Sequence, residues 1–453
     1  MPRTILRIAN GQGFWGDSID APAALVEAGG IDYLTLDYLA EVTMSIMQRQ
    51  KRKDPRAGYA TDFVDVMKRI MRPCKEKGIR VIANAGGVNP GACLERLLET
   101  AKELGVTPFR IATLEGDDIL ANLDDLLARG AGLASMDNGR PLSDVRDRVL
   151  SANVYLSTHA IAEALATGAD VVVTGRCTDP GLALGPMIHE FGWKRDDWNR
   201  LAAGTVAGHI LECGAQTSGG NYTRWWEVPN LEAVGYPVVE VGADGGFVVT
   251  KPRGTGGVVN VASVTEQVLY EMGDPARYLS PDVVVDFRTI RLSQEGPDRV
   301  RVSGVEGMPD TDFFKVSISY LSGWKASGQL TISGPFAREK ARKCASIVWS
   351  RLERAGVKFE ETSTELLGLD SCHGGIAPVP PEIGEVVLRL GVRDADRGRV
   401  ERFGKELAPL ITAGPPGVTG FAGGRPRAQE VVAFWPALIP KNLVETRVRV
   451  EEV

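Results

Sequence analysis

The spacing of apolar residues divides the chain into a first and a second part. Up to about residue 230, short apolar segments alternate with segments in which apolar residues recur every three or four positions, which predicts strands alternating with helices. The predicted strands are residues 4–9, 33–36, 80–83, 109–113, 153–156 and 170–174, and the predicted helices include 21–28, 61–78 and 92–104. This order is typical of an α/β domain with a doubly wound parallel sheet.

After about residue 230 the pattern changes to antiparallel hairpins. Residues 238–241 and 247–250 flank a glycine-containing turn, and residues 283–292 pair naturally with residues 299–303. We expect another antiparallel pair from residues 314–321 and 328–332, then a long amphipathic helix over 336–355. The sequence therefore predicts an α/β ligand-binding domain over residues 1–230 and an α+β domain with an antiparallel sheet over residues 231–453.

Composition and charge exclude several classes of protein. Of the 453 residues, 43% are apolar and 24% charged, which is usual for folded proteins and excludes a disordered chain. The net charge of −6 provides no basic field for nucleic acid. No apolar run is long enough for a membrane span, and the N-terminus carries no secretory signal, so we expect a cytoplasmic protein without membrane contact.

Glycine-rich polar loops follow two of the predicted strands. The carboxyl ends of parallel strands meet at one edge of a sheet, where glycine allows close approach of a ligand and carboxamides can bind carbonyl or hydroxyl groups. The substrate-binding candidates here are Asn10, Gly11, Gly13, Asn84, Gly86, Gly87 and Asn89. The alternative is that both segments are turns that close the strands. Residues 11–16 match GxGxxG by letter, but the predicted helix begins later, which disfavours a dinucleotide site.

Three residues are candidates for general acid and base chemistry. Asp17 lies in the first loop, Glu115 lies beside Asp117 and Asp118, and His159 follows a predicted strand. Neighbouring carboxylates can raise one another's pKa or hold a divalent cation, although solvated acids at a helix start are an alternative. The four histidines show neither HxH nor HExxH spacing, so we predict no resident metal or cofactor, with a divalent cation as the remaining option.

Two cysteines are candidates for thiol chemistry. Cys177 follows a β-branched strand between Arg176 and Asp179, a setting that can lower a thiol pKa. The alternative is a structural turn in which Arg176 and Asp179 bind the substrate. His209 precedes Cys213 by four residues on a predicted helix, which would place both on one face.

Two further loops concentrate groups that bind anions. The first contains Gln216, Ser218, Asn221 and Tyr222, and we expect it to hold a carboxyl or thioester oxygen. The second places Lys251 and Arg253 in a glycine-rich turn, which suits a phosphate or carboxylate, although a plain hairpin exit is equally consistent. The Walker pattern GxxxxGK[ST] is absent.

Long strings in the sequence are specific to one family. They are NGQGFWGDSIDAP, IANAGGVNP, VVVTGRCTDPGLALGP, ECGAQTSGGNYT and PRGTGGVVN. Through these strings the chain resembles the acyclic terpene utilisation family AtuA over about residues 4–436. The resemblance implies a role beside branched acyl-CoA breakdown, including citronellol and geraniol catabolism. Many members resemble this chain with a small C-terminal domain added, so the resemblance also implies a separate small subunit or a version that works without one.

These observations lead to one expected function and two alternatives. We expect a catabolic enzyme of the hydratase or lyase type that acts on an acyl-CoA or other carboxylate substrate by acid–base chemistry, and that forms a homo-oligomer. The first alternative is a hydrolase or acyl transferase that uses Cys177. The second is a non-catalytic subunit that works with a small partner protein.

Overall fold

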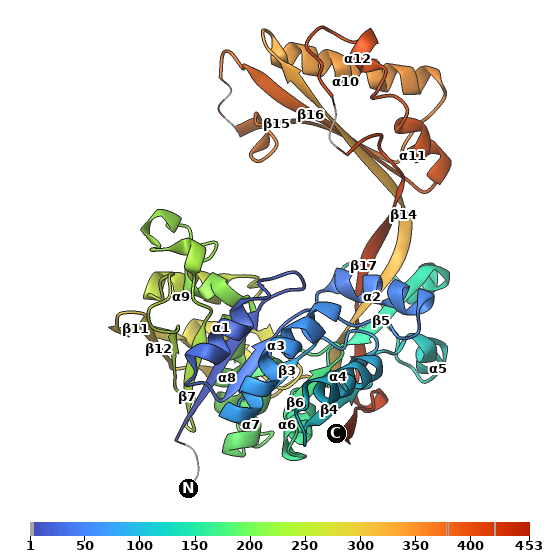
Figure 1. Ribbon diagram of the computed structural model, residues 1–453. Helices are drawn as coiled ribbons and strands as arrows, with labels where there is room; N and C mark the ends of the chain where they lie inside the picture. The colour runs from blue at the N-terminus through green and yellow to red at the C-terminus, as the bar shows by residue number, and fades with distance from the viewer. Residues whose placement is uncertain (1–3, 377, 379, 421–422) are drawn as a thin grey trace. The chain divides into compact units, whose positions relative to one another are not determined.

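The chain folds into two compact units. The computed structural model describes residues 4–376, 378, 380–420 and 423–453. The first unit contains the residues up to Ser319 together with Phe434–Val453, and the second contains Tyr320–Ala433. The chain enters the second unit through β14 (Phe313–Ser333) and leaves it through β17 (Gln429–Pro440), so the second unit is an insertion in the sequence of the first (Figure 1).

A ten-stranded mixed sheet forms the centre of the first unit. Five strands run parallel in the order β1-β2-β3-β6-β4, and antiparallel strands extend the sheet at both edges. The parallel strands are β1 (Ile5–Gln12), β2 (Tyr33–Leu36), β3 (Arg80–Ala83), β6 (Val171–Thr174) and β4 (Arg110–Glu115). The added strands are β7 (Val238–Gly242), β8 (Phe247–Thr250), β12 (Arg299–Ser303) and β11 (Arg291–Gly296) beside β1, and β18 (Arg447–Glu452) beside β4.

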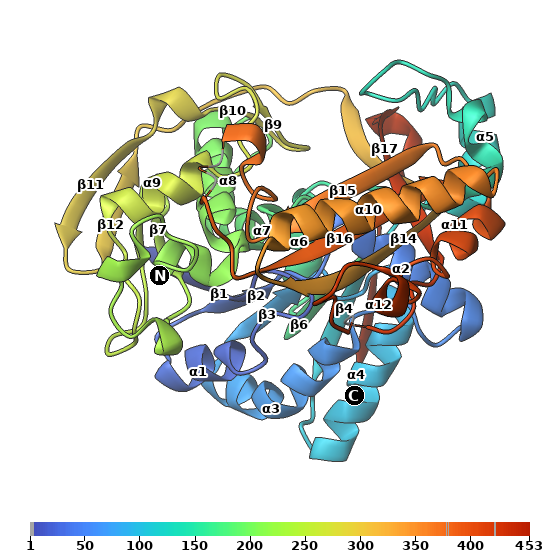
Figure 2. The same cartoon turned by 90° about the horizontal axis from the view of Figure 1, so that it is seen from above.

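Helices cover both faces of the parallel strands (Figure 2). One face carries α1 (Ala21–Ala28), α3 (Thr61–Lys77) and α4 (Pro90–Leu104), and the other carries α6 (His159–Ala166), α7 (Gly181–Phe191) and α8 (Trp198–Glu212). Burial on both sides explains why β2, β3 and β6 are continuously apolar rather than alternating. The predicted α/β class, with a parallel sheet followed by antiparallel hairpins, is confirmed.

Apolar side chains of α3 and the central strands form the core on one face. Phe63, Met67 and Ile70 recur along one side of α3 and pack in a cluster with Leu34 and Val81. Full burial of such a side chain contributes about 1.5–3 kcal/mol, which gives the carboxyl edge of the sheet a rigid support.

Three features differ from the expectation. Strands β7 and β8, which follow residue 230, join the first unit's sheet: β7 pairs with β1, which is otherwise an open edge, and β8 pairs with β7. The expected pair at 314–321 and 328–332 is wrong: β14 is one strand, and Gly323, with φ of 114°, bends it instead of forming a turn. Strand β5 (Val149–Val154) lies outside the large sheet and pairs with β14.

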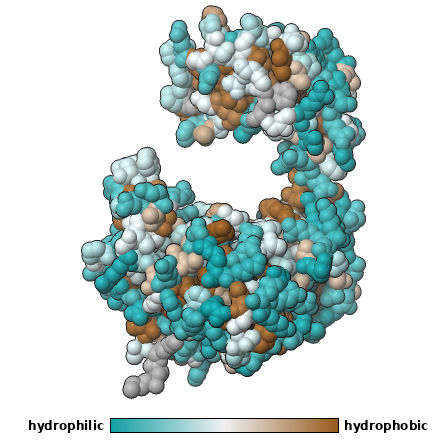
Figure 3. All heavy atoms as spheres, viewed as in Figure 1, coloured by the Kyte–Doolittle hydropathy of each residue, from teal (hydrophilic) through white to brown (hydrophobic). Residues whose placement is uncertain are grey.

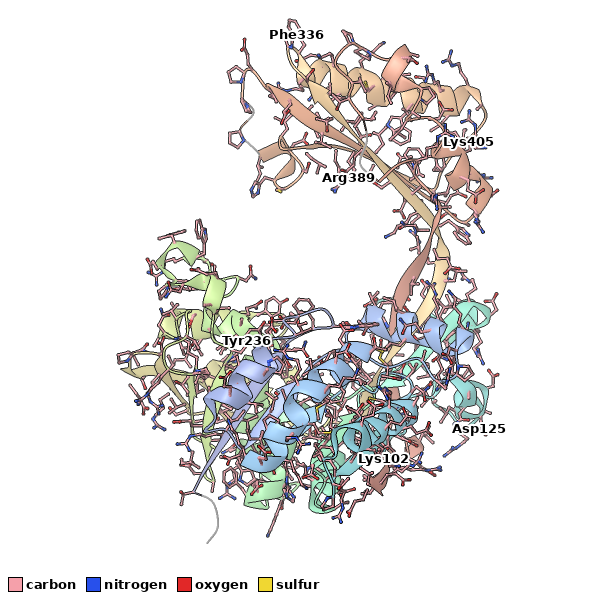
Figure 4. All side chains as sticks on the ribbon, viewed as in Figure 1. Lys102, Asp125, Tyr236, Phe336, Arg389 and Lys405 are labelled. Atoms are coloured by element: carbon pink, nitrogen blue, oxygen red, sulfur yellow. The ribbon has the colours of Figure 1, made fainter. Side chains whose placement is uncertain are left out.

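The second unit is a four-stranded antiparallel sheet with helices on one face. The strand order is β15-β16-β14-β17, with β15 (Glu361–Leu367) and β16 (Glu385–Asp394). Alternate residues of β16, Leu388 and Leu390 among them, are buried against α10 (Ala337–Arg354), α11 (Arg397–Phe403) and α12 (Leu410–Ala413). Arg389 extends from the opposite face and binds both carboxylate oxygens of Glu365 (Figure 4).

The remaining elements of the first unit surround the sheet. They are α2 (Glu41–Lys53), α5 (Leu123–Ala128), α9 (Val261–Leu269) and a small sheet of β13 (Glu306–Met308), β10 (Val284–Asp286) and β9 (Tyr278–Leu279). Hydrophilic residues predominate on the face seen in Figure 3, with small separate hydrophobic patches. Within the described residues, no helix is both long and apolar enough to cross a bilayer.

Candidate functional site

A cavity of about 580 Å³ opens in the first unit at the carboxyl edge of the parallel strands. Ligands of open α/β sheets bind at this edge, and the volume is in the range of small-molecule sites. The lining residues come from the loops after β1, β2 and β6, from the start of α2 and from the segments after α8 and α9. They are Gly13, Phe14, Asp37, Leu39, Ala40, Glu41, Arg176, Asp179, Glu212, Cys213, Gln216, Tyr270 and Glu271. Five carboxyl groups therefore surround one guanidinium.

Arg176 is the buried cation of the cavity, with only 2% of the residue exposed. Its Nη1 and Nη2 donate to the two carboxylate oxygens of Asp179, and Nη1 also donates to the carbonyl of Leu39 at 3.0 Å. The guanidinium carbon lies 4.3 Å from the centre of the Tyr155 ring. Its Nε has no hydrogen-bond partner among the described residues. A buried charge is stable only when paired, so Arg176 and Asp179 form one structural unit.

Asp37 follows β2 directly and is 4% exposed. Its Oδ1 accepts hydrogen bonds from Asn84 Nδ2 at 2.6 Å and from the amide of Leu39 at 3.1 Å. Burial and the nearby negative charge of Asp179 raise the pKa of Asp37 well above its ordinary value. Asn84, whose Oδ1 also accepts from the amide of Tyr38 at 2.7 Å, holds Asp37 at the strand end.

Glu212 and His209 form a second buried group at the end of α8. His209 Nδ1 lies 3.1 Å from Glu212 Oε1, and His209 Nε2 lies 3.0 Å from the carbonyl oxygen of Gln267. Glu212 Oε2 is buried without a hydrogen-bond partner among the described residues. Burial raises the pKa of Glu212 to about 7, although His209 acts to lower it. Burial lowers the pKa of His209, but the contact with Glu212 outweighs this effect and raises it.

The geometry favours a proton in this pair. A carbonyl oxygen accepts only, so Nε2 of His209 must carry hydrogen. In a neutral ring Nδ1 then carries no hydrogen. It would lie 3.1 Å from a carboxylate oxygen that carries no hydrogen either, unless Glu212 is protonated. A proton on Glu212 or on Nδ1 relieves this contact, and Glu212 Oε2, which has no partner among the described residues, belongs to a group that can donate or accept one.

A network at the end of β1 holds the floor of the cavity. Asn10 Nδ2 donates to the carbonyl of Leu211 at 2.6 Å, and its Oδ1 accepts from the amide of Gln12 at 3.0 Å. Asp17 accepts from the amide of Gly13 at 2.8 Å and from the hydroxyl of Tyr236 at 2.6 Å (Tyr236 is labelled in Figure 4). These bonds fix the loop after β1 against the end of α8.

The structure brings together four predicted substrate-binding residues at the cavity: Gly13, Arg176, Asp179 and Gln216. Asn10, Asn84 and Asp17 lie behind them and position the wall. Three predicted glycines face other parts of the protein rather than open space. An added Cβ would contact Pro22 or Leu36 at Gly11, Thr174 at Gly86 and Met47 at Gly87.

Other candidates lie outside this cavity. Glu115 lines a separate pocket with Asp118 and Arg129, and His159 lines one with Asp282 and Lys441. Asn89 caps α4 by accepting from the amide of Ala92 at 3.4 Å. The five remaining candidates do not line the cavity either: Ser218 is buried, Asn221 has a φ of 54°, the Tyr222 hydroxyl accepts from Arg224, and Lys251 and Arg253 line another cavity.

Neither cysteine candidate has the environment of a reactive thiol. Burial raises the pKa of Cys177 to about 12, and its Sγ contacts Thr174 Oγ1 at 3.5 Å. Burial also raises the pKa of Cys213 to about 12, and His209 is directed to Glu212. The thiolate is the reactive form, so these environments oppose nucleophilic chemistry at either residue.

Sequence reasoning missed several lining residues, namely Asp37, Glu41, Glu212, Tyr270 and Glu271. Asp37 directly follows a predicted strand, so the rule applied to the other strand ends could have found it. Glu212 lies three residues after His209 on α8, a spacing as favourable for contact as that of Cys213. Glu41, Tyr270 and Glu271 come from neighbouring segments whose proximity only the fold determines.

Among the described residues, no cluster of three or more His, Cys, Asp or Glu side chains is placed to hold a metal ion. Three carboxyl groups of the cavity have other partners: Asp179 pairs with Arg176, Glu212 lies against His209, and Glu41 Oε1 accepts from the hydroxyl of Tyr155 at 2.7 Å. The arrangement is thus one of proton-holding groups around a fixed positive charge.

The chain matches the model of a protein family. No curated protein sequence matches the chain significantly. The family model described as acyclic terpene utilisation family protein AtuA matches residues 6–450, which is nearly the whole chain and includes both units. The chain therefore belongs to the AtuA family of acyclic terpene utilisation proteins.

Proposed function

We propose that the chain is a catabolic enzyme of the hydratase or lyase type, which moves protons on an acyl-CoA or other organic-acid substrate in the acidic cavity. Membership of the AtuA family suggests a catabolic role. The observation that carries the proposed chemistry is the pair of buried carboxyl groups, Asp37 and Glu212, in a cavity with Arg176. Groups with raised pKa in a cleft are typical of acid–base sites.

The two carboxyl groups suit different roles. Glu212, with a pKa of about 7, is present in both forms near neutral pH and can act as the base. Burial and Asp179 raise the pKa of Asp37, which favours its protonated form, so it can act as the acid. In a dehydration, Glu212 takes the proton from the carbon next to the carbonyl, and Asp37 gives its proton to the departing hydroxyl. Water leaves, a carbon–carbon double bond forms, and hydration is the reverse.

Charge restricts which part of the substrate enters. Asp179 already occupies both terminal nitrogens of Arg176, so this guanidinium is not free to bind a carboxylate through them. Together with Glu41 and Glu271 on the wall, this disfavours an anionic group in the cavity. The reacting part is therefore an uncharged acyl group, such as a thioester.

The test is turnover of a panel of branched acyl-CoAs and organic acids, read by mass spectrometry as gain or loss of one water. We expect Glu212→Gln and Asp37→Asn to lower turnover by about 100-fold or more, since a positioned acid or base contributes that much. Glu103→Gln, which changes an exposed carboxyl on α4, is the matched control. Full turnover in both cavity variants would exclude the proposed roles.

A binding subunit is the alternative that this experiment separates. Saturable binding of an acyl-CoA without any product, together with copurification of a small protein, would support a non-catalytic role in a complex. The buried cysteines give less support to the hydrolase alternative, because their raised pKa keeps the thiols protonated.

A further inference from the structure

A second cavity, of about 770 Å³, lies on the first unit beside the added antiparallel strands. It is bounded by β1, β7, β8 and β12 and by the end of α1, elements that lie together at the left of Figure 1. None of its lining residues lines the acidic cavity. Its charged lining residues are Arg7, Lys251, Arg253, Arg299, Glu240 and Asp298, a formal excess of two positive charges. This excess is notable in a chain with a net charge of −6.

Two guanidinium groups share one carboxylate on the floor of this cavity. Arg7 Nε lies 3.1 Å from Glu240 Oε1, and Arg299 Nη2 lies 2.8 Å from Glu240 Oε2. Glu240 can balance only one of the two charges. Glu295, 4.0 Å from Arg299, is itself shared with Arg301. The contacts with Glu240 occupy one nitrogen of each guanidinium, which leaves further N–H donors on both side chains.

The loop after β8 supplies the other two cations, and they differ in function. Lys251 is buried, pairs with Asp298 at 3.1 Å and donates to the carbonyl of Thr255 at 3.0 Å, so it fixes the loop. Arg253, two residues later, is exposed and forms no ion pair with any carboxylate of the described residues. An unpaired guanidinium on a fixed loop at the cavity wall is available to a ligand.

We propose that this cavity binds a phosphate-bearing ligand through Arg7, Arg253 and Arg299. The excess of two positive charges matches a phosphate dianion, and guanidinium groups form paired, charge-assisted hydrogen bonds with phosphate oxygens. The proposal is independent of the acid–base chemistry in the other cavity, because it concerns different residues and is tested by binding alone.

The test is isothermal titration calorimetry of the full chain with inorganic pyrophosphate at low and high salt. We expect saturable binding that weakens with salt, and about a tenfold loss of affinity in Arg253→Gln and in Arg299→Gln, as expected for one charge-assisted contact. The control is Arg56→Gln, which removes an exposed charge on the segment after α2. Arg56 does not line this cavity, so the variant should bind pyrophosphate with wild-type affinity. Titrations with adenosine diphosphate and glycerol 3-phosphate then distinguish a nucleotide from a small phosphomonoester.

Three results would overturn the proposal. They are no saturable binding of pyrophosphate, equal affinity for acetate at the same ionic strength, and an equal loss of affinity in Arg56→Gln. Arg253 forms no ion pair within the part of the chain that the structure describes, so Arg253→Gln should melt at the wild-type temperature, and its lost affinity cannot be attributed to unfolding.

Discussion

His209 and Glu212, one turn apart on α8, face each other with 3.1 Å between Nδ1 and Oε1, while the carbonyl of Gln267 determines which ring nitrogen carries hydrogen. This contact makes the proton-holding state of Glu212 depend on His209. His209 does not line the cavity, so it acts through Glu212 and is a positioning residue.

Replacing His209 should therefore move a pH profile. His209 lowers the pKa of Glu212 through its hydrogen bond and its charge, so His209→Gln should raise that pKa further above 7. The limb of the rate profile that reports ionisation of Glu212 should shift to higher pH, and turnover at neutral pH should fall as less of the base is ionised. His189→Gln, at a half-buried histidine beside Arg80, is the control. An unchanged profile in His209→Gln would contradict the proposed role of Glu212.

Asp117 should make the protein less stable as the pH rises. It is 2% exposed, accepts from the amide of Arg176 at 2.8 Å and from Asn153 Nδ2 at 2.9 Å, and burial raises its pKa to about 7. Between about pH 4 and pH 7 the folded state retains a proton that the unfolded chain releases, so stability falls across this window. In Asp117→Asn, the decrease in the free energy of unfolding across this pH window should be smaller than in the wild type by up to about 4 kcal/mol.

The measurement is urea unfolding at several pH values. Asp125→Asn, on exposed α5 (Figure 4), should leave the pH dependence unchanged. Parallel curves for the wild type and Asp117→Asn would show that Asp117 does not hold the extra proton.

Gly13 should not tolerate a side chain. A Cβ at this position would lie 2.6 Å from the backbone carbon of Cys213 and 2.9 Å from the carbonyl oxygen of Glu212. Gly13→Ala must push the loop after β1 away from the end of α8, and we expect a loss of about 2–4 kcal/mol in the free energy of unfolding.

The matched control for Gly13→Ala is Gly91→Ala in the first turn of α4. The added Cβ there has open space, with Arg449 Nη1 at 4.0 Å, and alanine favours the helix by about 0.5–1 kcal/mol. Thermal melting of both variants is sufficient. If the two variants were equally stable, the close packing of the β1 loop on α8 would be wrong.

Alkylation should distinguish the cysteines. Cys372 is exposed, whereas Cys177 is fully buried with a pKa raised to about 12. Iodoacetamide at neutral pH should modify Cys372 in the folded protein and leave Cys177 intact until denaturant is added. Peptide mass spectrometry reads both sites in one experiment. Rapid modification of Cys177 in the native state would revive the thiol hydrolase alternative.

The parallel strands were predictable because burial on both faces leaves a continuous apolar signal. The bounds of β2, β3 and α1 agree with the sequence to the residue. The single strand β14 was not predictable, because Ser322 and Gly323 have the composition of a turn, whereas the pairing of β14 with β16 from Trp324 onward depends on residues distant in the sequence. The hairpin β7–β8 was recognised, but local pattern does not indicate that it adds to β1.

The site residues that directly follow a strand were predictable from the sequence. Those that reach the cavity from segments distant in the sequence were not. Arg176 and Asp179 follow β6 and were found by that rule. Glu41, Tyr270 and Glu271 reach the cavity from segments separated by more than 200 residues, and no local signal relates them. The same long-range contacts determine the charge environment of Glu212, so its raised pKa could not be inferred from helical spacing alone.

The interrupted sequence of the first unit has a consequence for biosynthesis. Strand β18, which covers the edge of β4 through pairing from Arg447 with Glu115 to Glu452 with Arg110, leaves the ribosome only after the entire inserted unit. Until then β4 is an unprotected edge on a nascent chain, open to pairing with other chains. The time during which the edge of β4 stays open therefore includes the synthesis of the whole inserted unit.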